Sequence, residues 1–157
     1  MSAALLSFLD YNYLTLLLLL GCAVVMFINR KAGVPWTRFF ALALVLVLLT
    51  AMTDWGDYWC WYLSESLSPG PALTGLIRMR TLCATAHYVL MPVVIVLELL
   101  VIAPDSPRKG WIVLPALFNA LIYLLSPLLH SLAFRMDAQN EFHRGPLGYT
   151  IFFVLFF

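Results

Sequence analysis

Guanidinium, imidazole and carboxylate side chains gather in a few short stretches of an otherwise apolar chain. The stretch DWGDYWCWY, from Asp54 to Tyr62, combines two carboxylates with five aromatic rings, and the stretches RMR and FHR carry arginines. Guanidinium groups bind carboxylates and phosphates through paired hydrogen bonds, while aromatic rings supply apolar contact. This combination predicts a binding site for a small anionic or amphipathic ligand. The candidate ligand-binding residues are Asp54, Trp55, Trp59, Trp61, Arg78, Arg80, His87, Arg135, His143 and Arg144.

Purely structural explanations of the same residues stay open. Aromatic residues beside a long apolar run are typical of the belt at headgroup level in a membrane. Asp54 lies close to the expected hydrocarbon boundary and needs a partner there, so an ion pair with a nearby arginine would fix two helices together. His87 shares a helical face with Glu98, but they are roughly 16 Å apart along the axis and form neither a metal site nor an acid–base pair.

Signatures of catalysis and of metal binding are missing from the sequence. It contains no HExxH, no GxSxG and no phosphate-binding glycine loop. The cysteines Cys22, Cys60 and Cys83 show no CxxC spacing; a disulfide between Cys60 and Cys83 and free buried thiols both stay open. We therefore expect no enzyme activity, no cofactor and no metal. Without a basic face, we also expect no nucleic-acid partner.

The composition places the chain in a membrane. Of its 157 residues, 63% are hydrophobic and 11% charged, whereas soluble domains average about 45–50% apolar residues. A helix needs about 20 apolar residues to cross the hydrocarbon. We predict one all-α module over residues 1–157, a polytopic transmembrane helix bundle with four complete spans and a partial fifth. The spans are expected at about 12–29, 38–60, 74–103, 111–134 and 146–157, so the chain is expected to stop inside its fifth helix.

The distribution of basic residues predicts the orientation of these spans. The link after the first span carries Arg30, Lys31 and Arg38 without an acid, and the link after the third carries Arg108 and Lys109. Links rich in lysine and arginine stay on the cytoplasmic side. The N terminus is then outside, and the candidate binding residues lie toward the extracytoplasmic side.

The segment SPLLHSLAFRMDAQNEFHRGPLGYTIFF follows a proline-containing apolar stretch and predicts a structured connection. Asp137 to Asn140 have the composition of a turn, and Pro146 suits the first turn of the next helix. Arg144 then either pairs with an acid beside a plain turn or lies, with His143, at the rim of a pocket. Both interpretations stay open.

The same segment resembles a pattern in multi-span N-terminal regions of bacterial signalling proteins, where Ser-Pro, an aspartate-containing turn and Arg-Gly-Pro-Leu precede the next span. A looser likeness extends to RMRTLCATAHYVLMPVVIVLELLV. The pattern is similar to the seven-helix sensor region that precedes diguanylate cyclase (GGDEF) or histidine kinase domains. The residues that carry the resemblance are Ser126, Pro127, Asp137, Asn140, His143, Arg144, Gly145, Pro146 and Leu147.

The resemblance implies a sensory input module in the bacterial inner membrane, which binds a ligand or partner on its extracytoplasmic side. It would relay that event to a cytoplasmic output domain outside this chain. Membrane lipids and a small ligand are the expected partners, and a homodimer is left open. Two other classes also stay open: a small membrane transporter or channel subunit, and a lipid-modifying membrane enzyme.

Overall fold

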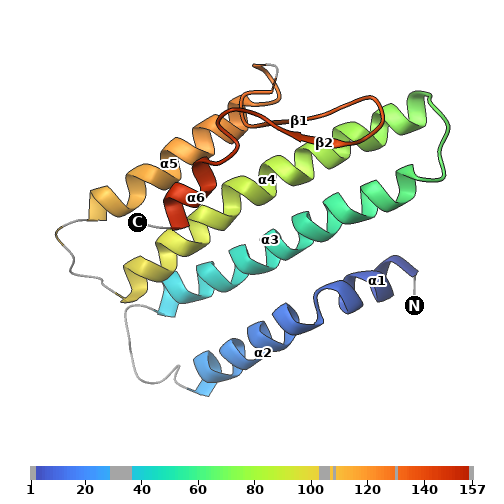
Figure 1. Ribbon diagram of the computed structural model, residues 1–157. Helices are drawn as coiled ribbons and strands as arrows, with labels where there is room; N and C mark the ends of the chain where they lie inside the picture. The colour runs from blue at the N-terminus through green and yellow to red at the C-terminus, as the bar shows by residue number, and fades with distance from the viewer. Residues whose placement is uncertain (1–2, 29–36, 103–106, 108, 130, 156–157) are drawn as a thin grey trace.

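The structure is a computed structural model that describes residues 3–28, 37–102, 107, 109–129 and 131–155. It contains helices and one small hairpin (Figure 1). The elements are α1 (Ala3–Tyr11), α2 (Tyr13–Ile28), α3 (Thr37–Ser64), α4 (Pro71–Ile102), α5 (Lys109–Leu125), β1 (Phe134–Met136), β2 (Phe142–Arg144) and α6 (Thr150–Leu155).

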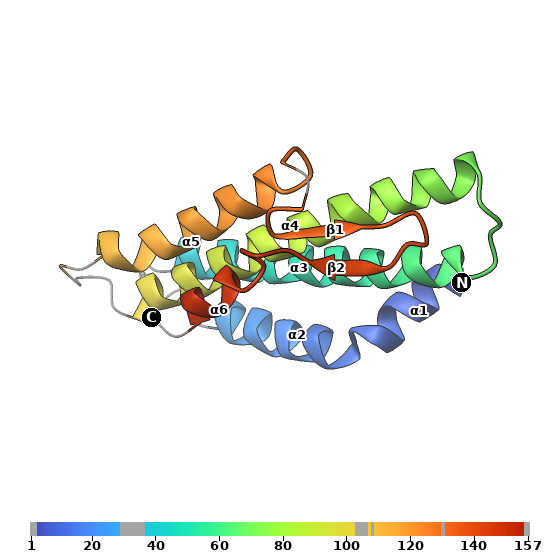
Figure 2. The same cartoon turned by 45° about the horizontal axis from the view of Figure 1, so that its top comes forward.

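The long helix α4 lies at the centre of the assembly. It packs against α3 on one side and α5 on the other, while α1 and α2 lie along α3 (Figure 1). The hairpin runs over the first half of α4, and α6 packs on α5 and α4 (Figure 2). Most large apolar side chains on α2 and on the outer face of α5 are exposed, as expected of helices that face lipid.

The prediction of a mostly helical membrane protein is confirmed, whereas the predicted four complete spans are not. In the described part of the chain, α3 and α4 supply the two helices that are long and apolar enough to cross a membrane, over Phe40–Ser64 and Pro71–Leu100. The pair α1 and α2 adds a third crossing if the two helices, bent by 73°, form one span. Helix α5 has 17 residues, fewer than the about 20 typical of a span, and is not among the helices long enough to count as one.

A buried asparagine lies at the bend between α1 and α2. Asn12 is only 5% exposed, and its side-chain amide donates to the carbonyl of Phe8 at 3.3 Å. An asparagine that bonds to nearby backbone competes with regular helical hydrogen bonding and so favours a break. The first span, predicted at about 12–29, corresponds to α2 and is preceded by the separate short helix α1.

Helix α5 ends at Leu125, well before the predicted end at about residue 134, because Ser126 and Pro127 stop it. A residue that precedes proline is disfavoured in helical conformation. The buried hydroxyl of Ser126 accepts from the backbone N–H groups of Ala133 and Phe134, each at 3.0 Å, and donates to the carbonyl of Phe134 at 2.8 Å. These bonds anchor the start of a hairpin that the sequence did not predict.

The hairpin is antiparallel, with Phe134 opposite Arg144 and Met136 opposite Phe142. Its connection contains the predicted turn around Asp137, and Asn140 adopts a positive φ of 64°, which asparagine tolerates better than most residues. The apolar side of the hairpin packs on aromatic residues of α4 and α5. The ring of Phe134 lies 6.2 Å from that of Tyr88 on α4 and 6.0 Å from that of Tyr123 on α5.

Candidate functional site

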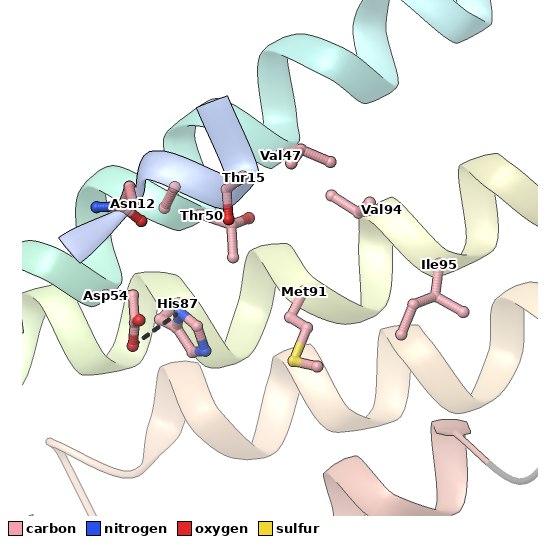
Figure 3. Close-up of a pocket in the computed structure, with 10 residues that line it drawn as sticks. Asn12, Thr15, Val47, Thr50, Asp54, His87, Met91, Val94 and Ile95 are labelled. Atoms are coloured by element: carbon pink, nitrogen blue, oxygen red, sulfur yellow. Dashed lines mark ion pairs between the residues drawn. The ribbon is translucent and has the colours of Figure 1, made fainter. Parts of the chain in front are cut away.

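Two adjoining cavities lie beside the paired helices α3 and α4. The larger is also walled by α2, is partly open and has a volume of about 340 Å³ (Figure 3). It is lined by Asn12, Thr15, Val47, Thr50, Ala51, Asp54, His87, Met91, Val94 and Ile95. The smaller has a volume of about 160 Å³ and is lined by Asp54, Asp57, Arg80, Ala84, His87, Tyr88 and Phe142. Asp54 and His87 line both, so they stand between a mainly apolar and a mainly polar space.

Helical periodicity explains why these side chains share one space. Thr50 and Asp54 are four residues apart on α3, and His87 and Met91 are four apart on α4; such residues lie on one face of a helix. Since α3 and α4 pack along their length, the two faces meet. Asp54 on α3 and His87 on α4 lie at the same end of the two contacting faces, so the packing of the helices brings these two residues together.

Asp54 and His87 lie close together but do not form a hydrogen bond. Oδ1 of Asp54 and Nδ1 of His87 are 3.8 Å apart, which is beyond hydrogen-bond distance. Nδ1 of His87 is buried and has no hydrogen-bond partner among the described residues. The Asp54 side chain remains 44% exposed and that of His87 23%, and Tyr11 also contacts the Asp54 carboxyl. The pair therefore retains capacity to bind another polar group.

The guanidinium of Arg80 already donates hydrogen bonds to two protein acceptors. Arg80 is 8% exposed, its Nε donates to Oδ1 of Asp57 at 3.0 Å, and its Nη1 donates to the carbonyl of Asn140. The side chain of Asn140 in turn donates to the hydroxyl of Ser64 at 2.7 Å. This chain of contacts joins α3, α4 and the hairpin at one wall of the smaller cavity.

The three tryptophans among the predicted site residues lie outside both cavities. Trp55 donates through its indole N–H to the hydroxyl of Ser7 at 3.3 Å and meets Phe8 edge-on at 5.4 Å. Trp59 stacks on Trp55 at 5.7 Å, and Trp61 is 41% exposed. These contacts attach α1 to α3 and leave an aromatic surface at one end of the bundle, as an interfacial belt would require.

The other predicted arginines line neither cavity, although Arg144 contacts Tyr88 of the smaller one. Arg78 and Arg135 are exposed. The guanidinium of Arg144 lies over the rings of Tyr149 and Phe152, at 5.1 and 5.8 Å, and donates to the carbonyl of Gly148 at 3.4 Å. Of the four predicted arginines, Arg80 alone lines either cavity.

His143 belongs to a cluster at the tip of the hairpin, together with Asp137 and Glu141, whose ligand-type atoms lie within 4.8 Å of one another. Oδ1 of Asp137 accepts from the backbone N–H groups of Gln139 and Glu141, each at 2.9 Å. Its Oδ2 contacts Nε2 of His143 at 2.6 Å. Both carboxylate oxygens of Asp137 thus make contacts within the hairpin, and these contacts explain the cluster as a structural feature.

These contacts make the stability of the hairpin depend on pH. The backbone N–H of Glu141, and after it the imidazole of His143, lower the pKa of the Asp137 carboxyl below its usual value. A lowered folded-state pKa contributes stability that is present above the unfolded value of about 3.9 and is lost as the pH falls through the folded value. Thermal unfolding of the parent and of Asp137→Asn should therefore differ at about pH 6 and converge toward about pH 2. Gln139→Ala serves as the control, because Gln139 is exposed and does not titrate. A difference in unfolding temperature between the parent and Asp137→Asn that stays constant over this pH range would contradict the prediction.

The structure adds site residues that the sequence did not single out. Asn12 lines the larger cavity at the bend between α1 and α2, and Thr50 and Met91 line it from the helical faces that carry Asp54 and His87. Asp57 lines the smaller cavity and forms an ion pair with Arg80. Helical spacing from Asp54 and His87 points to Thr50 and Met91, whereas no sequence signal identifies Asn12. No family model, curated protein or solved structure was found that matches this chain.

Proposed function

We propose that the chain is a membrane-embedded input module of a bacterial signalling protein, which binds a small amphipathic ligand in the two adjoining cavities. The observation that carries the proposal is the joining of an apolar space to a polar one at Asp54 and His87. Ligand sites are typically concave, mostly apolar and equipped with a few convergent polar groups. The larger cavity, at about 340 Å³, lies at the lower end of the usual range of about 300–1,000 Å³.

The connections around Arg80 support a relay from this site. Arg80 lines the smaller cavity and holds Asn140 of the hairpin, and the hairpin leads into α6. A ligand that binds one arrangement of α3 and α4 more tightly than another shifts the population toward it. The hairpin would carry that shift to whatever follows α6. In this proposal the protein lies in the bacterial inner membrane with its N terminus and its cavities toward the extracytoplasmic side.

The two other classes receive less support from the site. A transporter or channel needs polar groups along a path across the bilayer, whereas the larger cavity is walled by Val47, Met91, Val94 and Ile95 away from Asp54. An enzyme that uses the aspartate–histidine pair in the manner of a serine or cysteine hydrolase needs that nucleophile beside the pair. Neither serine nor cysteine lines the two cavities. We therefore propose a binding role without catalysis.

Filling the larger cavity tests the binding role. Met91→Trp places a large ring in that space, while Met79→Trp changes an exposed methionine of the same helix that is 53% exposed and lines neither cavity. Binding of octylamine, octanol and octanoate is measured by thermal shift in nanodiscs of neutral lipid, with empty nanodiscs as the blank. At least one compound should stabilise the parent and Met79→Trp but not Met91→Trp. If none distinguishes the parent from Met91→Trp, the cavity is not a ligand site.

A further inference from the structure

We infer that the ligand of this site carries a cationic head group, an amine or a quaternary ammonium, on a single short apolar chain. The inference rests on the proposed binding role and reverses the charge that the arginines suggest in the sequence. It follows from the balance of charges around the two cavities, from the rings beside them and from the shape of the apolar space.

Carboxylates outnumber guanidinium groups among the residues that line the smaller cavity. Asp54 and Asp57 stand against one guanidinium, that of Arg80, while Arg144 contacts Tyr88 without lining the cavity itself. Arg80 already donates to Asp57 and to the carbonyl of Asn140, so an anion would have to compete with two protein acceptors. An anionic head group would also be repelled by the carboxylate of Asp54, since like charges disfavour each other most where water is scarce.

Asp54 is the acceptor that remains. Within the described ranges, no lysine or arginine forms an ion pair with it, and its nearest basic atom is Nδ1 of His87 at 3.8 Å. A carboxylate has about four acceptor positions, so contacts with Tyr11 and His87 do not exhaust it. Its position on both cavities places a bound ammonium group in the smaller one and the attached chain in the larger one.

Aromatic rings complete the site for a cation. Tyr88 and Phe142 line the smaller cavity together with the two aspartates. An ammonium group is attracted to ring faces as well as to carboxylates, and this combination recognises alkylated amines in particular. In the larger cavity, Val47, Met91, Val94 and Ile95 supply apolar contact. Its volume of about 340 Å³ suits one short chain rather than the two chains of a membrane lipid.

A comparison of head groups on one chain length tests the inference. Octylamine and octyltrimethylammonium are titrated against octanol and octanoate in neutral-lipid nanodiscs at about pH 7.5, where a free alkylamine is protonated and a free carboxylic acid is ionised. The parent should bind octylamine roughly 10- to 100-fold more tightly than octanol, the range typical of a hydrogen bond to a charged group. Octyltrimethylammonium has no N–H, but it should also bind more tightly than octanol through its charge and the aromatic rings. Octanoate should bind most weakly.

Variants separate the charge of Asp54 from its bulk. Asp54→Asn should remove the preference for cations and retain the affinity for octanol, while Asp54→Glu should restore part of the preference. Asp10→Asn serves as the matched control, because Asp10 is an exposed carboxylate on α1 that lines neither cavity. If the parent binds octanoate as tightly as octylamine, or if Asp54→Asn keeps the preference, the cationic ligand is wrong although the binding role stands. If no octyl compound distinguishes the parent from Met91→Trp, the binding role itself has failed.

Discussion

Replacing Arg80 by alanine should lower the free energy of unfolding by roughly 3–5 kcal/mol, the cost typical of breaking a buried ion pair. The substitution leaves the carboxylate of Asp57 without its guanidinium and the carbonyl of Asn140 without its donor. The side chain of Asp57 is 29% exposed, so partial hydration places the expected loss near the lower end of that range. Unfolding in mixed micelles, followed by circular dichroism, measures the change.

Arg78 provides the control, because it lies two residues away on the same helix and is exposed. Arg78→Ala should change the stability by no more than about 0.5 kcal/mol. Adding Asp57→Asn to Arg80→Ala should recover part of the loss, since the uncompensated charge is then gone. Equal effects of Arg78→Ala and Arg80→Ala would show that the buried network contributes nothing particular to the fold.

Replacing Gly145 by alanine should be comparably damaging, for a steric reason. A Cβ atom at this position would overlap the backbone carbonyl oxygen of Ser131 and would lie 2.7 Å from that of Leu132. The backbone N–H of Gly145 also donates to the carbonyl of Ala133 at 2.7 Å, so the two segments cannot separate without losing this bond. Overpacking of this kind costs about 1–3 kcal/mol and occasionally more, and obstruction by backbone atoms favours the upper end.

Gly75 in α4 gives a control with the opposite sign. Nothing lies within 4 Å of a Cβ added there, and alanine is favoured over glycine inside a helix by roughly 0.5–1 kcal/mol. Gly75→Ala should therefore raise the thermal unfolding temperature, while Gly145→Ala should lower it. A Gly145→Ala protein as stable as the parent would mean that residue 145 has room for a Cβ atom beside the carbonyl groups of Ser131 and Leu132.

The helices α3 and α4, which are long and apolar enough to cross a membrane, could be predicted because length and apolar composition depend only on residues that are consecutive in the sequence. The apolar runs that become α3 and α4 are long enough to cross the hydrocarbon as single helices, whose backbone groups away from the two ends bond within the helix, as lipid demands. The other element boundaries depend on single side chains that act over a distance. At the bend between α1 and α2, the side chain of Asn12 bonds to the carbonyl of Phe8. Ser126 accepts two N–H groups from the strand that follows α5, and no periodicity announces such a bond.

The site divides in the same way. Composition and position in the sequence single out Asp54, Arg80 and His87, because an ionisable residue within an apolar helix needs a partner or a function. Which partner each one takes depends on how the helices pack. The packing of α3 on α4 pairs Asp57 with Arg80 and places Asp54 beside His87. Arg144, at the end of the hairpin, lies over the rings of Tyr149 and Phe152. The sequence by itself predicted a helical membrane protein with its candidate binding residues toward one side; tertiary structure decided which of them meet, because charge pairing depends on distances of a few ångströms that residue spacing does not specify.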